Sequence, residues 1–179
     1  MQPTLLIASP QTRDPLFERT VVLVFEHTEH GALGVVVNRQ LQHKVEDVLD
    51  LAEGPDLAEF AGVPVVWGGP VGTNHGTVVT GAHLTEQELG WALPNGLSVT
   101  RSQDALLRLL GERAPLMLCL GYAGWAAGQL DREISRGGWL WTDCDARIVF
   151  DTPAEERWSM ALATLGLTPG VVWMQPVDE

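Results

Sequence analysis

Positive charge is scarce in this sequence. Eleven Lys and Arg residues stand against 23 Asp and Glu residues, the formal net charge is -12, and Lys44 is the single lysine. Nucleic-acid binding draws much of its affinity from clustered cations that release phosphate counterions, and no stretch of this chain gathers several of them. We therefore do not expect direct nucleic-acid binding, and the acidic surface should favour solubility and repel anionic membranes.

Long apolar runs and paired cysteines are also missing. The longest apolar run, around residues 114–120, is too short to cross a bilayer, and the N-terminus lacks the cationic region of a secretion signal. The two cysteines, Cys119 and Cys144, form neither a CxxC pair nor a disulfide framework. These absences favour a cytoplasmic protein with no membrane partner.

Several motifs of catalysis and cofactor binding are absent. The chain contains no G-x-G-x-x-G, G-x-x-x-x-G-K-[ST], H-E-x-x-H or G-x-S-x-G. Cys144 lies between two aspartates, which should raise its thiol pKa, and Cys119 belongs to an apolar run typical of a core. We therefore predict no cofactor and no metal site, and we do not expect an enzyme.

The residues that are present predict one globular domain over 1–179. The composition, 45% hydrophobic and 19% charged, is ordinary for a soluble fold that can bury a sizeable core. Short apolar or β-branched runs separated by turn residues predict strands. They cover 4–8, 20–25, 32–37, 64–67, 77–80, 91–93, 97–99, 139–141 and 148–150. We expect hairpins at 29–31 and 95–96, the 64–67 and 77–80 strands as neighbours, and the last two strands paired.

Helices are predicted by apolar residues at i, i+3, i+4 and i+7. They fall at 45–52, ended by Gly54-Pro55; at 103–110, capped by Ser102 and ended by Gly111; around 129–136; and near the C-terminus. The last carries a Thr152-Pro153-Ala154-Glu155 capping box and the apolar residues Trp158, Ala161, Leu162 and Leu165. Together the elements predict an α+β fold with a mixed, largely antiparallel sheet and helices on one side.

The glycine-rich stretch Gly121-Tyr122-Ala123-Gly124-Trp125 is the first candidate site. We interpret it as a turn between a buried strand and a helix, where unpaired amides and the helix dipole suit an anion. A tight turn in which Tyr122 and Trp125 simply pack is the alternative. Further on, Gln129 and Glu133 share one helix face, which either lines a cleft or is solvated.

Two other polar groups are candidates. Glu26 and His27 belong to a segment with metal-type ligands, although an ordinary hairpin end explains them as well. Arg13, Asp14 and Arg19 flank an apolar pair in the first loop. This loop either holds an anionic group or is fixed by an Asp–Arg ion pair.

Several linked motifs in one order resemble the YqgE/AlgH family of bacterial proteins. They read LIASP, DPLFERTVVLVFEHTEHGALGVVVNR, WGGPV, VTRSQDALLRL, LGYAGWAAGQLDREI, GWL and FDTPAEERW, and they run nearly end to end. The resemblance implies a single α+β domain whose sheet curls into a bifurcated pseudo-barrel flanked by helices. It also implies a cytosolic protein without an established activity or cofactor, some of whose relatives are labelled transcriptional regulators through genetic association.

The family motifs add Asn38 and Gly69 to the candidates without giving any of them a role. This sequence departs from the family pattern at Thr20, Gln40 and His75, and His75 replaces a usual arginine and so removes a permanent cation. The candidate ligand-binding cleft is then Arg13, Asp14, Arg19, Glu26, His27, Asn38, Gly69, Gly121, Tyr122, Gly124, Trp125, Gln129 and Glu133.

Our functional hypothesis is a regulatory module that acts indirectly, through a small ligand or a protein partner. The alternative is a hydrolase-like or metal-assisted enzyme that uses Glu26, His27 and the Gly121–Gln129 cleft.

Overall fold

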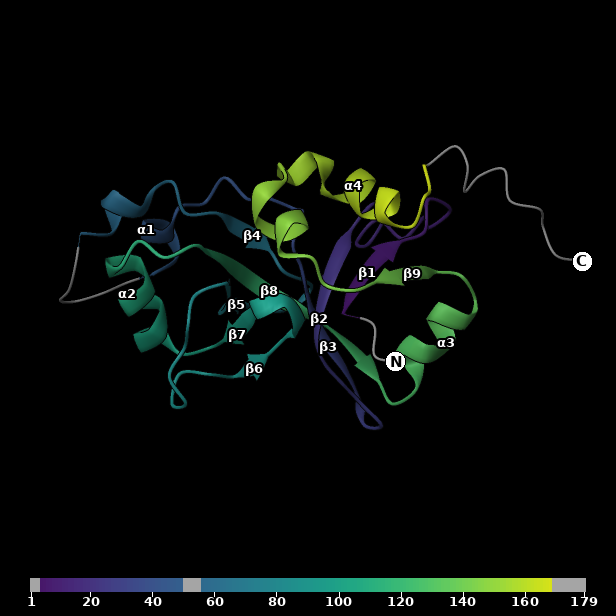
Figure 1. Cartoon of the computed structure of the whole chain (residues 1–179), viewed down its shortest axis with the longest axis horizontal. Helices are drawn as coiled ribbons and strands as arrows, with labels where there is room; N and C mark the ends of the chain where they lie inside the picture. Colours follow the sequence, from purple (N-terminus) through teal and green to yellow (C-terminus); the bar gives the residue numbers. More distant parts are fainter. Residues whose placement is uncertain (1–3, 50–55, 169–179) are drawn as a thin grey trace, which may run out of the picture.

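The computed structural model describes residues 4–49 and 56–168 of the chain. Nine strands form one branched sheet, with helices against its faces and ends (Figure 1). The strands are β1 Leu5–Ala8, β2 Val21–Thr28, β3 Gly31–Val36, β4 Val65–Trp67, β5 Val71–Thr80, β6 Trp91–Ala92, β7 Ser98–Thr100, β8 Leu116–Ala126 and β9 Trp139–Thr142. The helices are α1 Val45–Val48, α2 Gln103–Gly111, α3 Gln129–Ser135 and α4 Arg157–Thr164, with short 3-10 turns at Leu57–Phe60, Pro94–Gly96 and Ala154–Glu156.

Strand β8 is the element that the rest of the sheet shares. Its first half, Leu116–Leu120, is a continuous apolar run, as expected of a strand covered on both faces. This half lies between β4, which is parallel to it, and β5, which is antiparallel to it, so that Cys119 has Val66 and Thr77 as its two neighbours. The second half of β8 pairs instead with β3.

The sheet order is β6-β7-β5-β8-β3-β2-β1-β9, with β4 attached to β8 beside this path. The predicted α+β class and largely antiparallel sheet are confirmed. The sheet does branch at β8, but the two ends of the described path, β6 and β9, do not pair with each other. The expected pseudo-barrel is therefore not closed.

Most predicted elements occur where the pattern placed them. The β2–β3 and β6–β7 hairpins are present, and the Ser102 hydroxyl accepts a hydrogen bond from the Ala105 N–H at 3.1 Å as the cap of α2. For the predicted 45–52 helix, the structure gives α1 over Val45–Val48, and residues 50–55 lie outside the described part of the chain.

Three local predictions were wrong. Residues Arg147–Asp151 form a π-helical turn and not a strand: the Asp145 carboxylate accepts the Arg147 N–H at 2.9 Å where the turn begins, and the turn buries Ile148 and Val149. The β4 and β5 strands are not neighbours, because β8 lies between them. The Thr152 hydroxyl does not cap the last helix but donates to the Arg147 carbonyl at 3.0 Å, and α4 begins only after a 3-10 turn.

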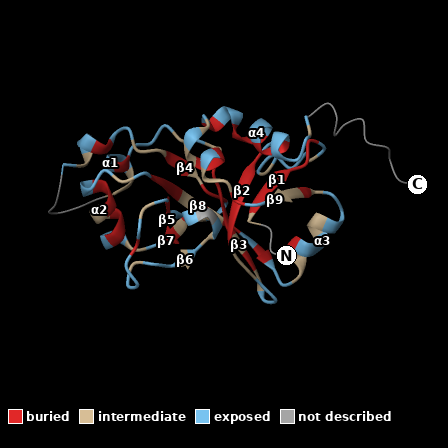
Figure 2. Ribbon diagram, viewed as in Figure 1, coloured by how far each residue is buried: buried red, intermediate tan, exposed pale blue. Residues whose placement is uncertain are grey.

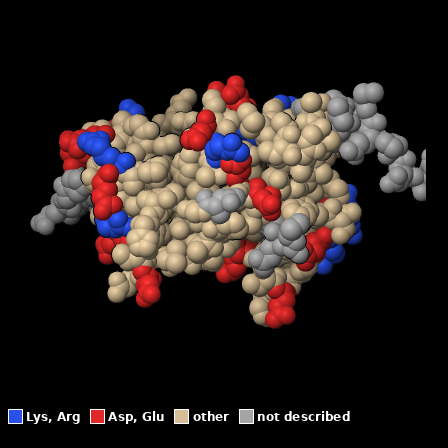
Figure 3. Space-filling view, viewed as in Figure 1, with Lys and Arg blue, Asp and Glu red and all other residues tan. Residues whose placement is uncertain are grey.

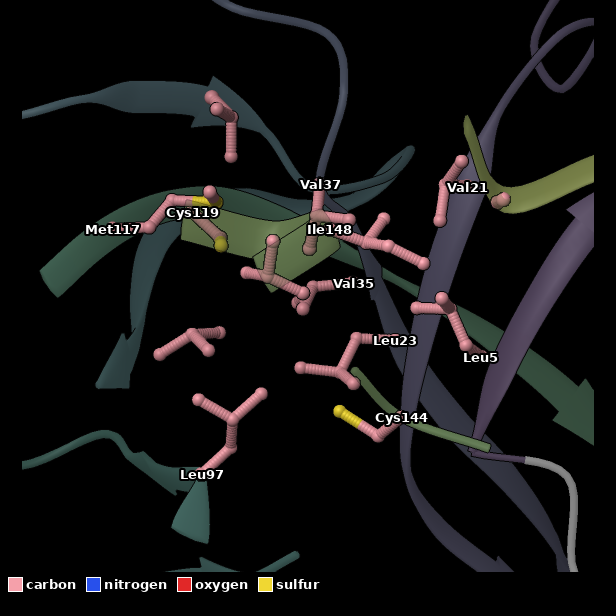
Figure 4. Packing of buried hydrophobic residues seen from close by; sticks show 14 of the residues in the cluster. Leu5, Val21, Leu23, Val35, Val37, Leu97, Met117, Cys119, Cys144 and Ile148 are labelled. Carbon is pink, nitrogen blue, oxygen red and sulfur yellow. The ribbon is translucent and has the colours of Figure 1, made fainter. Parts of the chain in front are cut away.

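Strand β8 joins two arms of the sheet, one formed by β4, β5, β6 and β7 and the other by β1, β2, β3 and β9. Buried residues occur in both arms (Figure 2). One cluster contains residues of β1, β2, β3, β7 and β8 together with the π-helical turn, and Figure 4 shows Leu23, Val35, Met117 and Ile148 among them. A second cluster lies around β1, β2 and α3, and a third lies between β5, β8 and α2. Helix α4 packs on the first through Trp158, whose indole N–H donates to the Ala8 carbonyl at 2.9 Å.

None of the described helices is long and apolar enough to span a bilayer.

Candidate functional site

The structure distributes the predicted site residues over several places. Those of the first loop make local contacts. The Asp14 carboxylate accepts the Leu16 N–H at 2.9 Å, and an Arg13 guanidinium N–H donates to the Pro10 carbonyl at 3.2 Å. The guanidinium of Arg19 lies 4.4 Å from the ring centroid of Trp158 on α4.

Asn38 ties this loop to the sheet. Its side-chain oxygen accepts the Val21 N–H at 2.8 Å, and its side-chain amide donates to the Arg19 carbonyl at 2.8 Å. Both halves of the amide are therefore used to fix the entry of the chain into β2. This geometry accounts for Asn38 through backbone positioning.

The predicted turn at Gly121–Trp125 was wrong, because β8 continues through these residues to Ala126. Buried and exposed residues alternate there: Ala123 and Trp125 are buried, whereas Gly124 and Ala126 are exposed. That alternation with period 2 indicates a strand, and the glycines obscured it. The amides of this stretch consequently meet neighbouring strands and not an open hollow.

Gly69 and Gly121 let two segments of backbone approach closely. Both have positive φ, 153° and 79°, and a Cβ on Gly121 would overlap the carbonyl oxygen of Gly69. The glycines are needed where β8 passes the segment between β4 and β5. They form a packing contact between main chains.

Gln129 and Glu133 of α3 form a polar cluster with two tryptophans. The Oε1 atom of Glu133 accepts the indole N–H groups of Trp125 and Trp139 at 3.1 and 3.0 Å. Its Oε2 atom accepts from the Gln129 amide at 2.8 Å, and Gln129 in turn accepts the Ala126 N–H at 3.0 Å. This cluster holds α3 onto the end of β8.

Glu26 and His27 turn to different partners. The Glu26 carboxylate accepts the Trp91 indole N–H at 3.3 Å, whereas the His27 Nε2 atom lies 3.3 Å from an Asp131 carboxylate oxygen. Within residues 4–49 and 56–168, no group of three or more His, Cys, Asp and Glu side chains is placed to hold a metal ion. Both residues border a small pocket of about 210 Å³, but their side chains bond to different partners and do not bond to each other.

A separate pocket is lined by Tyr122 and by none of the other predicted site residues. This pocket, of about 540 Å³, is lined by residues of β5, β8, the start of α2 and the end of α1, four elements that Figure 1 labels. It is lined by Val48, Leu49, Asn74, His75, Gly76, Val78, Arg101, Ser102, Gln103, Leu106, Leu118, Leu120 and Tyr122. Its volume lies within the usual range of small-molecule sites, roughly 300–1,000 Å³.

Arg101 is the permanently charged side chain among the described residues of this lining. It follows β7 directly and precedes the Ser102 cap of α2. Its guanidinium lies 5.0, 5.5 and 5.8 Å from the ring centroids of Tyr122, Trp91 and Phe25, and its Nε–H donates to the Thr77 hydroxyl at 3.4 Å. Stacking on aromatic faces orients a guanidinium while leaving N–H groups at its edge for a ligand.

The motif VTRSQDALLRL contains Arg101, Ser102 and Gln103, and its pattern indicates a helix cap and the family but no pocket. His75 was noted as a departure from the family and was not placed in a site. Nothing in local spacing connects His75 of β5 with Arg101, which follows β7, and they line one pocket only because β5 pairs with β7 and β8.

Both thiols lie in the interior. Burial raises the pKa of Cys119 to about 12, and burial together with the nearby Asp145 carboxylate raises that of Cys144 to about 12. A thiol with such a pKa stays protonated near neutral pH and is a poor nucleophile.

Comparison with known proteins identifies the family. The sequence model of the AlgH-like family matches residues 5–170. This chain belongs to the AlgH-like family. It is 40% identical over 170 residues to a UPF0301 protein of Paraburkholderia phymatum, covering 93% of this chain and 89% of the relative. A UPF0301 protein of Ralstonia nicotianae is 41% identical over 170 residues with the same coverage.

Solved structures agree with this AlgH-like assignment. The solution structure of AlgH from Pseudomonas aeruginosa has a TM-score of 0.78 at 36% identity and covers 99% of this chain and 95% of its own. A crystal structure of a protein from Corynebacterium diphtheriae has a TM-score of 0.68 at 23% identity, covers 92% and 87%, and shows the shared fold alone. The resemblance seen in the sequence is therefore confirmed.

Proposed function

We propose that this AlgH-like protein is a regulatory module whose state is set by a small ligand bound in the pocket between β5, β8 and α2. The observation that carries the proposal is the pocket itself. It combines an apolar floor with convergent polar groups from two separate elements, Asn74 and His75 of β5 and Arg101–Gln103 at the start of α2. Such a combination is typical of small-molecule sites.

We favour a binding role over a catalytic role because the candidate catalytic side chains are neither activated nor paired with one another. The buried thiols are held protonated, and Glu26 and His27 bond to Trp91 and Asp131 and not to each other. Nucleophilic catalysis requires an activated nucleophile next to a base; the described lining contains no cysteine, and its serine, Ser102, accepts the Ala105 N–H as the cap of α2.

We further propose that any effect on transcription is indirect and that the protein works in the cytoplasm. The chain carries 23 acidic residues against 11 basic ones. On the face shown in Figure 3, acidic and basic side chains are scattered and form no broad basic patch among the described residues. Such a surface attracts nucleic acid weakly, which favours a route through a ligand or a protein partner.

Thermal unfolding in the presence of a nucleotide and metabolite panel tests the pocket. A ligand at one hundred times its Kd stabilises the folded state by roughly 2.7 kcal/mol, which is readily seen as a rise in Tm. The variant Leu120→Trp should fill the pocket and abolish the rise, because Leu120 is half-buried and lines it. Met160→Trp, on an exposed position of α4, is the matched control. A panel that never raises Tm, or a rise that survives Leu120→Trp, would count against the proposal.

A further inference from the structure

We infer that the pocket between β5, β8 and α2 takes an organic anion with an apolar body, such as a carboxylate or a phosphate monoester on an alkyl or aryl group. This inference rests on the proposed function, because it concerns the ligand of the same pocket. It adds the chemistry by which that ligand is recognised.

The charges of the lining select an anion. The described residues of the lining include Arg101 and His75 but no Asp or Glu, in a chain that has 23 acidic residues. A carboxylate or phosphate entering the pocket therefore meets a guanidinium and, among the described lining residues, no carboxylate. A ligand cation would meet only repulsion from Arg101.

Arg101 is held ready for such a group. None of the ion pairs among the described residues involves Arg101, and its side chain is exposed. Its side-chain hydrogen bond to Thr77 uses Nε, and the ring contacts use the guanidinium plane, so the terminal N–H groups can make a forked bond to two oxygens of an anion. Because the side chain is already ordered, less conformational entropy is lost when the anion binds.

The apolar side chains of the lining indicate that the ligand also has an apolar part. Val78, Leu106 and Leu118 form a floor that is almost entirely buried, and Leu49 and Leu120 border it as half-buried side chains. A hydrocarbon group that leaves water for this apolar lining gains free energy in proportion to the apolar surface that it buries, most of which is its own. A small inorganic anion would leave this lining uncovered, so the ligand needs both parts.

Four octyl probes test the charge requirement, and acetate, an anion that lacks the apolar body and should bind far more weakly, tests the requirement for that body. Octanoate and octyl phosphate carry the anion, octanol is neutral, and octylammonium reverses the charge. Binding is followed by titration calorimetry and by tryptophan fluorescence, since Trp91 contacts Arg101. We expect the two anions to bind about 10- to 100-fold more tightly than octanol, the usual range for a charge-assisted hydrogen bond, and octylammonium to bind least. The ranking of octanoate against octyl phosphate shows which anion the site prefers.

Variants assign the effect to named side chains. R101Q should weaken octanoate binding about 10- to 100-fold, R101K should retain part of it, and octanol binding should be unchanged in both. R136Q removes an exposed arginine at the end of α3, away from the pocket, and should bind like the wild type. H75R adds a permanent cation to the rim and should tighten octanoate roughly two- to fivefold.

The outcomes distinguish this inference from the proposed function. Equal binding of octanol and octanoate, sensitive to Leu120→Trp, overturns anion recognition but leaves a ligand pocket in place. Anion binding that is unaffected by R101Q and H75R also overturns the inference. If no octyl probe binds, the inference fails; the proposed function then fails as well only when the metabolite panel is equally silent. H75R is expected to strengthen octanoate binding. It therefore tests the inference even if R101Q fails to fold.

Discussion

Glu133 shows how a single side chain can resemble a site residue and still have a structural explanation. One of its oxygens accepts two indole N–H groups, and the other accepts the Gln129 amide. Sequence spacing correctly placed Gln129 and Glu133 on one helix face but gave no sign of Trp139. The tryptophan lies beyond the helix in the chain, and only the pairing of β9 with β1 brings it back.

We predict that Glu133→Gln lowers the free energy of unfolding by about 1–2 kcal/mol. A carboxamide has one acceptor oxygen, so its NH2 group would face either the donating amide of Gln129 or the two indole N–H groups, which would then lose their acceptor. Urea unfolding measures the loss, and the indole N–H resonances of Trp125 and Trp139 should shift. Glu86→Gln, at an exposed position, serves as the control. Equal midpoints for both variants would contradict this role of the carboxylate.

Elements meet through backbone contacts that the sequence pattern does not reveal. The glycines of β8 looked alike in the sequence, and both suggested a turn. In the fold, Gly121 has φ of 79° and lies against Gly69, whereas a Cβ on Gly124 would meet its nearest neighbours at 3.9 Å. Two glycines in one strand therefore have different roles.

Gly121→Ala should destabilise the protein by about 2 kcal/mol or more, because the added Cβ overlaps the main chain of Gly69 at a backbone angle that disfavours side chains. Gly124→Ala is the matched control and should be neutral or slightly stabilising. Thermal and urea unfolding of the two variants measure the difference. Equal stability of the two proteins would show that the contact between β8 and Gly69 is not tight.

An ion pair fixes the turn before β6 to helix α2. The Glu88 carboxylate lies 2.7 Å from an Arg108 guanidinium nitrogen, and its side chain is only 13% exposed. The hydrogen bonds from Arg108 hold the pKa of Glu88 at about 2, below its usual 4.5. Because the folded-state pKa is the lower one, the pair stabilises the protein above the unfolded pKa and loses this effect as the pH falls from about 4.5 towards 2.

We therefore expect the wild type to be more stable than Glu88→Gln at pH 7. The two stabilities should converge as the pH is lowered through this window. Urea midpoints measured between pH 7 and pH 3 give the comparison, with Glu86→Gln again as the control. A constant difference at every pH would mean that the charge of Glu88 contributes nothing to folding.

At the scale of the whole molecule, β8 and the shared core make the two arms of the sheet interdependent. Met117 is completely buried in the cluster that contains residues of both arms (Figure 4). Opening one arm would expose side chains on which the other arm packs. The predicted single domain over 1–179 should accordingly unfold as one cooperative unit.

Met117→Ala tests this cooperativity. Truncating a buried methionine costs about 2–5 kcal/mol, whereas Met160→Ala, at a side chain 46% exposed, should cost far less. Fluorine-labelled tryptophan reports Trp91 in one arm and Trp139 in the other. Both signals should change at the same urea concentration in the wild type and shift together in Met117→Ala. Two separate transitions would instead indicate two independently folding parts.

The sequence by itself determined the local structure of this protein. Apolar runs, turn residues and a helix cap located β1, the two hairpins, α2 and α3, and they gave the α+β class, because such signals depend on residues a few positions apart. The linked motifs also identified the family.

Tertiary structure decided the pairing of distant segments and the place of the pocket. The position of β8 between β4 and β5, the helical turn at Arg147–Asp151 and the meeting of His75, Arg101 and Tyr122 all depend on which buried surfaces fit together. Local patterns cannot specify such contacts, because a strand that is apolar on both faces can pack against many different neighbours. Packing of the complete core selects one arrangement.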